Sequence, residues 1–167
     1  ATQVPLPGEG PWIDPKTKRI AGAFEGEALK VVSKTGGGAA PQGMAAFSLG
    51  QWSGQSHLWW TGAKPGDKLV LELSVEKAGT YEVLTSLTKA IDYGIVKLQW
   101  DGAAATDPID LFNNGVVNTS PISLGVHSLT AGPHRLTIEI VGANPKAVKN
   151  YMVGIDYIVL SPQKSSA

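Results

Sequence analysis

The stretch Asp67-Lys68-Leu69-Val70-Leu71-Glu72-Leu73-Ser74-Val75 decides the fold class, because its apolar side chains repeat with a period of two. Leucine or valine occupies every second position from Leu69 to Val75, and these residues alternate with Val70, Glu72 and Ser74. Successive side chains of a β-strand point to opposite faces, so this pattern predicts a strand with one buried face. No segment of useful length shows the period of an amphipathic helix.

The same alternation recurs on both sides of this stretch. Turn signals such as Asp101-Gly102 and Ala131-Gly132-Pro133 separate the repeats. About eight short strands divided by turns indicate an all-β fold, a β-sandwich or jelly roll of two antiparallel sheets. Residues 34–55, 103–120 and 142–152 are too long and polar for hairpin turns, and we expect function to reside on such loops. Besides 67–75, the expected strands are residues 21–33, 56–60, 80–88, 94–100, 122–129, 134–141 and 154–160.

The composition excludes several classes of function. The formal net charge of the 167 residues is zero, and the basic residues are not clustered, so we expect neither nucleic acid nor an acidic membrane as a partner. The absence of cysteine excludes disulfides and thiolate chemistry. The 20 glycines and 11 prolines suit a turn-rich β domain.

The proline-rich start and the polar end of the chain look like linkers. We expect residues 1–20 to be an extended lead-in, residues 21–161 to form a single β-sandwich module, and residues 162–167 to be a tail. Such ends are typical of a module that belongs to a larger protein, and we expect the module to be a monomer.

The last expected strand contains one carboxylate, Asp156, between Ile155 and Tyr157. Burying an unpaired carboxylate is costly, so Asp156 needs a partner. Glu25 and Glu27 could share a calcium ion with it, since side chains at i and i+2 of a strand share one face. The alternative is that both glutamates are solvated and that Asp156 pairs with a lysine or an arginine.

Tryptophans supply the first candidates for a sugar-binding surface. Adjacent strand positions point to opposite faces, so one of Trp59 and Trp60 should lie in the core and the other should be exposed or lie under a loop. An exposed indole offers a flat apolar surface to the C–H face of a sugar ring. Trp52 stands in a loop rich in Gly, Ser and Gln and is the better platform candidate. Alternatively, all three rings cap the core.

Two polar turns supply further candidates. Lys89, Asp92 and Tyr93 lie between two expected strands, and Lys149-Asn150-Tyr151 precedes the last one. Charged side chains can hydrogen-bond vicinal sugar hydroxyls while a tyrosine ring stacks on the sugar. We expect both turns to converge on one end of the sandwich. The alternative is a plain polar turn whose Tyr93 folds back onto the sandwich.

The order of these motifs resembles known modules over residues 22–160. Gly66–Leu73, Ala78–Val83, Leu129–Leu136 and Gly154–Ile158 resemble the centre of family 6 and family 35 carbohydrate-binding modules, which are galactose-binding-domain-like β-sandwiches. Leu58-Trp59-Trp60, Asp92–Val96 and Asp110-Leu111-Phe112 resemble a domain appended to bacterial glycoside hydrolases of the DUF2961 type.

This resemblance implies a structural calcium ion held by Glu25, Glu27 and Asp156, although the family usually has Ala where this chain has Gly26. It also implies that aromatic rings and an asparagine matching Asn150 hold the sugar. The function implied is a non-catalytic carbohydrate-binding module that targets an enzyme of the same chain to a poly- or oligosaccharide. Secretion, or placement at the surface or in the periplasm of a bacterial-type cell, would follow.

Two other functions stay open at this point. The chain could be a structural or interaction β-sandwich that packs on a catalytic domain and binds no sugar. It could also be a glycosidase in which a carboxylate pair such as Asp92 and Asp110 acts as acid and base.

Overall fold

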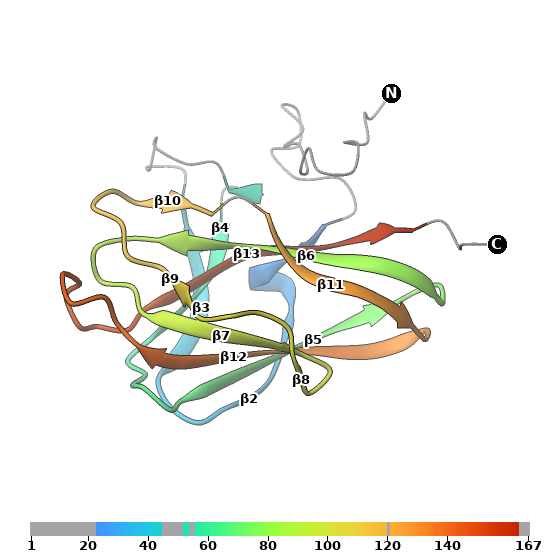
Figure 1. The fold of residues 1–167 in the computed structure, drawn as a ribbon, viewed down its shortest axis with the longest axis horizontal. Coiled ribbons are helices and arrows are strands. Elements are labelled where there is room, and N and C mark those ends of the chain that lie inside the picture. The colour runs from blue at the N-terminus through green and yellow to red at the C-terminus, as the bar shows by residue number, and fades with distance from the viewer. Residues whose placement is uncertain (1–22, 45–51, 54–55, 120, 164–167) are drawn as a thin grey trace.

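The computed structural model describes residues 23–44, 52–53, 56–119 and 121–163, which form a β-sandwich of two sheets with antiparallel strands (Figure 1). The fold class predicted from the sequence is confirmed. The expected lead-in at 1–20 and the tail residues 164–167 lie outside the described residues. Within the described ranges, no helix is long and apolar enough to cross a membrane.

The first sheet has seven strands. Its main path runs β10 (Val117–Asn118), β6 (Gly79–Lys89), β13 (Val153–Pro162), β4 (Ser56–Thr61) and β3 (Gly38–Gly43). In addition, β1 (Phe24–Glu25) pairs with β13, and β11 (Ile122–Leu129) pairs with β6.

The second sheet has six strands. Its main path runs β2 (Lys30–Lys34), β5 (Lys68–Val75), β12 (Gly132–Gly142), β7 (Ile95–Trp100) and β8 (Ala103–Ala104), and β9 (Ile109–Asp110) pairs with β7. A 3-10 turn, η1 (Gly26–Ala28), joins β1 to β2.

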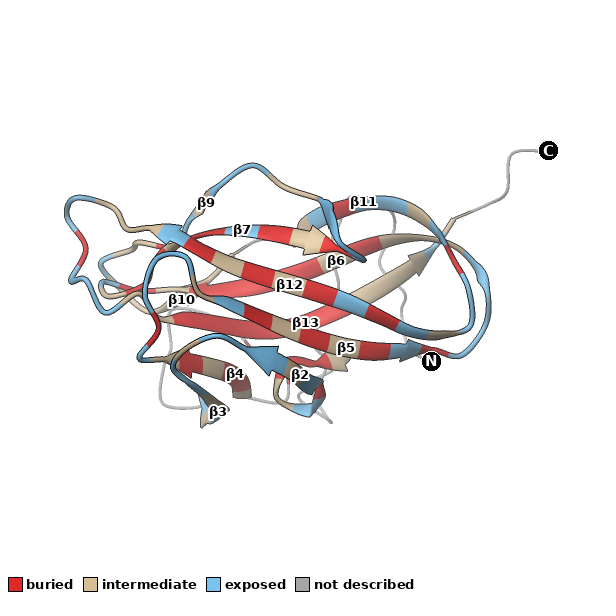
Figure 2. Ribbon diagram, turned by 90° about the horizontal axis from the view of Figure 1, so that it is seen from below, coloured by how far each residue is buried: buried red, intermediate tan, exposed pale blue. Residues whose placement is uncertain are grey.

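The hydrophobic core lies between the sheets and follows from the alternation in the sequence. Along β5 and β12, buried side chains alternate with more exposed ones, which Figure 2 shows as bands along each strand. Each fully buried aliphatic side chain contributes roughly 1.5–3 kcal/mol of transfer free energy. Fully buried members of the core include Trp60, Leu69, Leu98, Ile138 and Ile155.

Strand β13 differs from this pattern because Val153–Ile158 is buried without a break. It lies between β6 and β4 in the middle of its sheet. Its register with β6 shifts between Ile155 and Tyr157. Such a bulge leaves one residue out of the ladder and can redirect its side chain. Here that residue is Asp156.

Three predictions about the strands were wrong. Residues 34–55, predicted as a loop, contain β3, an exposed edge strand whose sequence Gly-Ala-Ala-Pro-Gln-Gly carries no alternation because it buries little. The predicted continuous strand at 21–33 is interrupted by η1. At Gly26 the chain passes so close to the carbonyl oxygen of Ile155 that a Cβ atom would overlap it. Short strands β8, β9 and β10 also lie within the predicted loop at 103–120.

Three connections meet at one end of the sandwich, which we call the loop end: residues 90–94, 111–116 and 143–152 (Figure 1, left). Main-chain hydrogen bonds hold them together, because Ala90 N donates to Leu111 O (3.0 Å) and Met152 N donates to Asp92 O (3.2 Å). The loop end is therefore a fixed backbone framework that carries polar side chains.

Candidate functional site

Glu25 and Asp156 are far apart in the sequence, but the fold brings these two buried acids together. Glu25 ends β1, and β1 pairs with β13 so that Glu25 lies opposite Tyr157, next to Asp156. Ser53 bridges the two acids, because its N–H donates to Asp156 Oδ1 (2.9 Å) and its hydroxyl donates to Glu25 Oε1 (2.7 Å). We call Glu25, Ser53 and Asp156 the acid site.

The acid site is electrostatically unsatisfied. Both acids are buried, and within the described part of the chain Glu25 Oε2 and Asp156 Oδ2 have no hydrogen-bond partner. Burial raises the pKa of Asp156 to about 8; the charges of Glu25 and Glu27 add to the increase, and the Ser53 N–H opposes it. Such a cluster favours a positive charge beside it, from a proton or a cation.

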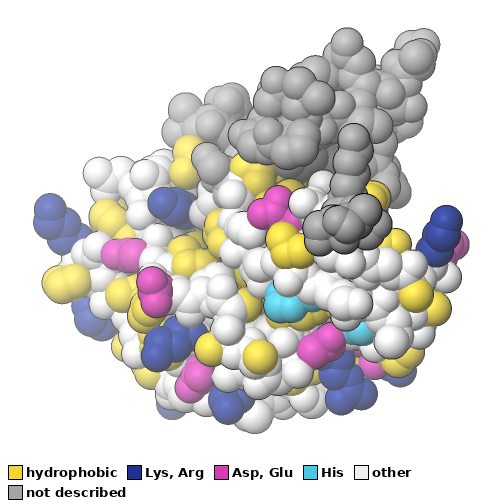
Figure 3. All heavy atoms as spheres, turned by 45° about the vertical axis from the view of Figure 1, so that its right-hand side comes forward, with side chains coloured by type: hydrophobic (Ala, Val, Ile, Leu, Met, Phe, Trp, Pro, Cys, Tyr) yellow, Lys and Arg dark blue, Asp and Glu magenta, His cyan; other side chains and the backbone are white. Residues whose placement is uncertain are grey.

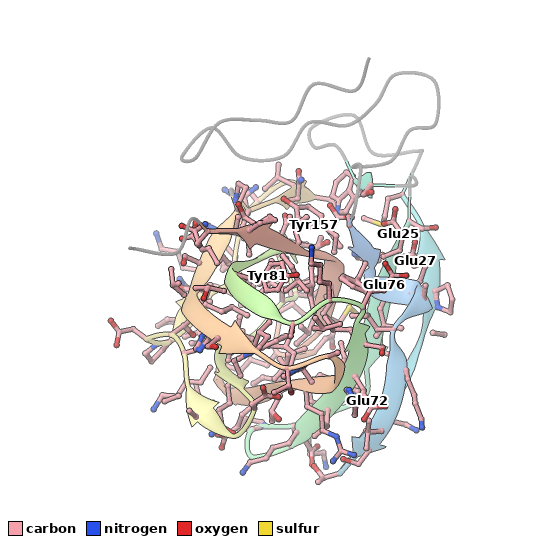
Figure 4. The ribbon with its side chains drawn as sticks, turned by 90° about the vertical axis from the view of Figure 1, so that its right-hand side faces the viewer. Glu25, Glu27, Glu72, Glu76, Tyr81 and Tyr157 are labelled. Carbon is pink, nitrogen blue, oxygen red and sulfur yellow. The ribbon has the colours of Figure 1, made fainter. Side chains whose placement is uncertain are left out.

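Glu27 does not lie where the sequence predicted. It belongs to η1 rather than to a strand, so the expected shared strand face of Glu25 and Glu27 was wrong. Figure 4 nevertheless shows the two side chains near each other, and the charge of Glu27 reaches Asp156.

The arrangement of these acids determines whether a calcium ion would fit between them. Among the residues described, no group of three or more His, Cys, Asp or Glu side chains is placed to hold a metal ion. The unpartnered oxygens of Glu25 and Asp156 still fit a hard cation, which accepts carboxylates together with hydroxyl and carbonyl oxygens. The acid site thus suits a cation held by two carboxylates and neutral oxygens better than a cage of three acids.

At the loop end, the structure brings together the two polar turns identified in the sequence. Asn150 Nδ2 lies 3.5 Å from Asp92 Oδ2, although 58 positions separate the two residues. Asp92 is half-buried, whereas Lys149 and Asn150 are exposed. A carboxylate and an amide therefore share one patch of surface, and Lys149 directly precedes the amide in the chain.

The tyrosines of these turns are not exposed platforms. Tyr93 is only 4% exposed, and burial, followed by the charge of Asp92, raises the pKa of its hydroxyl. The alternative, in which Tyr93 folds back onto the sandwich, is the one observed. Tyr151 is half-buried against the core, with a left-handed backbone at φ 51°. A positive φ is uncommon for a residue other than glycine and is found most often at functional turns.

The tryptophans divide as the strand geometry predicted, with one exception. Trp60 is fully buried and Trp59 is half-buried, on opposite faces of β4. Trp52, expected to be exposed, is 3% exposed, and its Nε1 donates to Thr88 Oγ1 (2.9 Å), so that expectation was wrong. Lys89 lies half-buried at the end of β6, opposite Val117.

Trp52 belongs to a buried chain of hydrogen bonds that was not predicted from the sequence. Because Thr88 Oγ1 accepts from Trp52, its hydroxyl hydrogen can point to His57 Nδ1 (2.6 Å). The other ring nitrogen of His57 then donates to Gln42 Oε1 (2.6 Å). This arrangement needs a neutral imidazole, and burial lowers the pKa of His57 to about 4.

A second histidine has the opposite environment at the other end of the sandwich. His134 lies against two acceptors, Asp101 Oδ2 (2.6 Å) and Thr130 O (2.8 Å), and stacks on Trp100. Burial lowers its pKa, but the hydrogen bonds to Asp101 and Thr130 outweigh burial, so the pKa is raised. When protonated, the ring can donate to both acceptors and thereby joins the two turns that contain Asp101 and Thr130.

Both side-chain oxygens of Asp110 already accept hydrogen bonds within the protein. Its Oδ1 accepts from Phe112 N (2.9 Å), and its Oδ2 accepts from Asn144 Nδ2 (2.7 Å). Both oxygens thus fix the turn at the loop end, which is a reason against the acid–base pair of Asp92 and Asp110 considered from the sequence. Charges of both signs are scattered over the face in Figure 3, with no large patch of one sign.

Comparisons with known proteins place this fold among domains of carbohydrate-active enzymes. Neither models of known protein families nor the curated proteins gave a match. Among solved structures, a Paenibacillus xanthan lyase is similar with a TM-score of 0.71 and 22% identity, covering 89% of this chain and 14% of the lyase. A Podospora anserina GH26-CBM35 β-(1,4)-mannanase is similar with a TM-score of 0.52 and 17% identity, covering 87% of this chain and 28% of the mannanase.

A family 35 carbohydrate-binding module from Clostridium thermocellum is also among the similar structures, with a TM-score of 0.49 and 20% identity, covering 84% of this chain and 98% of the module. The likeness to a DUF2961-type domain stays a prediction. At these identities the likeness concerns the fold: the chain has a β-sandwich fold of the kind found in carbohydrate-active enzymes, and family 35 carbohydrate-binding modules are among its structural neighbours.

Proposed function

We propose that this chain is a non-catalytic carbohydrate-binding module that holds a secreted, polysaccharide-active enzyme on its substrate. The fold supports this, because the similar xanthan lyase and mannanase both act on polysaccharides by name and are much longer than the matching region. A tethered module raises the local concentration of its enzyme without taking part in the chemistry.

The observation that carries the proposal is the meeting of Asp92 and Asn150 at the loop end. The carboxylate accepts hydrogen bonds from sugar hydroxyls, and the neighbouring amide both donates and accepts. Two such groups side by side match two hydroxyls on adjacent carbons of one sugar ring. Lys149 lies next to them and can donate a charge-assisted hydrogen bond to a further sugar oxygen.

Replacing Asn150 by Ala should weaken binding to the cognate polysaccharide about 2- to 10-fold, since a hydrogen bond between neutral groups contributes roughly 0.5–1.5 kcal/mol. The measurement is retardation in affinity gels containing xanthan, β-mannan, β-1,3-glucan or galactan. The melting temperature should stay within about 2 °C, because the side chain is exposed.

Asn114→Ala is the matched control, because Asn114 is an exposed asparagine in a turn of the same end. It should leave retardation unchanged. Equal retardation of wild type and Asn150→Ala in a gel that binds the wild type would remove the loop end as the binding site.

A structural module that packs on a catalytic domain is the second candidate. The burial of Trp52 and Tyr93 favours it, because neither ring is available to stack on a sugar. If the wild type binds none of these polysaccharides and no glycan on a broad array, this second function replaces the first.

The acid site serves this function indirectly by joining the two ends of the chain. A calcium ion bound by Glu25 and Asp156, with Glu27 nearby, would neutralise the buried acids and tie β1 to β13. When bound, the ion supplies charge and coordination only. The residues themselves position β1, and Ser53 ties the connection between β3 and β4 to both acids.

Removing calcium should therefore lower the melting temperature of the wild type. An ion present at 100 times its Kd stabilises the folded state by about 2.7 kcal/mol, which corresponds to roughly 5–10 °C for a chain of this size. The measurement is thermal unfolding with calcium chloride against a chelator, together with elemental analysis of the purified protein.

Asp156→Asn should abolish the difference between calcium and chelator. Asp107→Asn, the same change at an exposed aspartate, should keep it. If the wild type contains no metal and melts at one temperature in both buffers, the acids are neutralised by a proton and the calcium assignment is wrong.

A further inference from the structure

We infer that Ile91 and Val148 form the apolar platform on which the C–H face of a single pyranose ring rests at the loop end. This inference depends on the proposed function and adds the part of the site that the buried aromatic rings fail to supply. A sugar ring presents hydroxyl edges and an apolar face, so a site needs both polar partners and an apolar surface.

Ile91 and Val148 are two of the most exposed large hydrophobic residues in the described chain, at 47% and 50%. They come from different loops, yet Val148 N donates to Ile91 O (2.9 Å), so the two residues are direct neighbours. Apolar side chains left in water at a fixed position are favourable contacts for an apolar ligand surface, because their burial on binding releases water.

The polar partners adjoin this platform. Ile91 precedes Asp92, and Val148 precedes Lys149 and Asn150. The hydrogen bond from Val148 to Ile91 and the contact between Asn150 and Asp92 thus link the same two loops side by side. A ring lying on the platform would have its hydroxyl edge within reach of the carboxylate and the amide.

The turn that carries the platform is held in one conformation. Asn150 N donates to Val148 O (2.8 Å), and the next residue, Tyr151, has the left-handed backbone. Beneath it lies Gly94, where a Cβ atom would be 3.5 Å from Tyr151 Cα and 3.1 Å from Gly142 O. A preorganised surface loses little conformational entropy on binding, which favours recognition by a small contact.

The aromatic side chains of these loops cannot take this role. Tyr93 is buried, and Tyr151 is half-buried against the core. Two branched aliphatic side chains cover a smaller area than an indole, so the platform suits one ring rather than a long stretch of polysaccharide. It favours a pyranose with mostly equatorial hydroxyls, because the ring hydrogens then gather on its two faces.

A protein partner is disfavoured by the surroundings of the platform. Interface cores are depleted of charged residues, whereas here Asp92 and Lys149 directly adjoin the apolar pair. The rim instead offers a donor, an acceptor and a charged group within one sugar ring's reach. The platform and the polar pair together therefore fit a carbohydrate.

The test measures affinity-gel retardation of Ile91→Ala, Val148→Ala and the double variant against whichever of xanthan, β-mannan, β-1,3-glucan and galactan retards the wild type. The double variant should bind about tenfold more weakly, because it loses several buried CH₂ equivalents of contact. Ile91→Trp should bind more tightly, since a larger flat surface replaces the platform. Val126→Ala, at an exposed valine on β11, is the control and should behave as the wild type.

The outcomes separate the two proposals. If Asn150→Ala loses binding while the double variant and Ile91→Trp match the wild type, the platform is refuted and the proposed function stands. If the wild type is not retarded in any gel and binds no glycan on a broad array, both are overturned. Unchanged melting temperatures of the alanine variants show that a loss of retardation reflects the surface rather than the fold.

Discussion

Gly26→Ala is expected to destabilise the protein by at least about 3 kcal/mol, the upper range for overpacking a buried site, and to lower the melting temperature by roughly 6–12 °C. The added Cβ atom would overlap the carbonyl oxygen of Ile155. A backbone oxygen in the central strand β13 cannot move aside as the end of a flexible side chain can. Urea and thermal unfolding measure the change.

Gly43→Ala is the matched control, because a Cβ atom there would meet no atom within 4 Å. It should be nearly neutral. A melting temperature of Gly26→Ala within about 2 °C of the wild type would show that β1 can move away from β13, contrary to the close approach described here.

The same contact explains why the first acidic motif departs from the Glu-Ala-Glu pattern of the resembling modules. In this chain the 3-10 turn begins directly after Glu25 and brings position 26 against β13. Only a residue without a side chain fits there. The 3-10 turn also takes Glu27 off the strand.

Lowering the pH from 7 to 4 should remove about 3 kcal/mol of stability through His57 alone, because a shift of one pKa unit corresponds to about 1.4 kcal/mol. Burial lowers its folded-state pKa from 6.5 to about 4. The contribution is complete above pH 6.5, where the unfolded imidazole is also neutral. This contribution to stability is lost as the pH falls towards 4, because the unfolded state then binds a proton at His57 that the folded state does not bind.

Urea unfolding at several pH values measures this effect as the difference between the wild type and His57→Gln. The two free energies of unfolding should converge by about 3 kcal/mol between pH 7 and pH 4. Between pH 7 and 8 their difference should be constant, which is an internal control. If the His57 ring signals in an NMR titration of the folded protein show a midpoint near 6.5, the assignment of a buried, neutral imidazole to His57 is wrong.

The strands were predictable from the sequence wherever a face is buried. The alternation in 67–75 and 134–141 specified β5 and β12, because each buries one face against the other sheet. The edge strand β3 escaped prediction for the opposite reason: it is largely exposed, so nothing selects apolar residues at every second position. The single Gly-Glu-Ala turn of η1 follows from a contact with β13, which is distant in the sequence.

The candidate sites were predictable only in part. Asp156 could be singled out, because a carboxylate in an apolar strand is costly and needs a partner. Ser53, which bridges it to Glu25, is an ordinary loop serine in the sequence. The prediction that Trp52 is exposed was wrong, because local composition indicates a loop but does not show whether a ring in that loop packs against the rest of the protein. The hydroxyl of Thr88 on β6 accepts the hydrogen bond from the Trp52 ring and also contacts His57 on β4.

The position of β13 has a consequence for how the molecule is made. A ribosome delivers this strand last, yet it separates β6 from β4 and carries the pairing of β1. Until Val153–Pro162 has emerged, β6 and β4 have no common neighbour and the inner face of the first sheet cannot close. Pairing between distant segments is slow, because loop closure comes before the gain in contacts. Folding of this module therefore waits until nearly the entire domain has been synthesised.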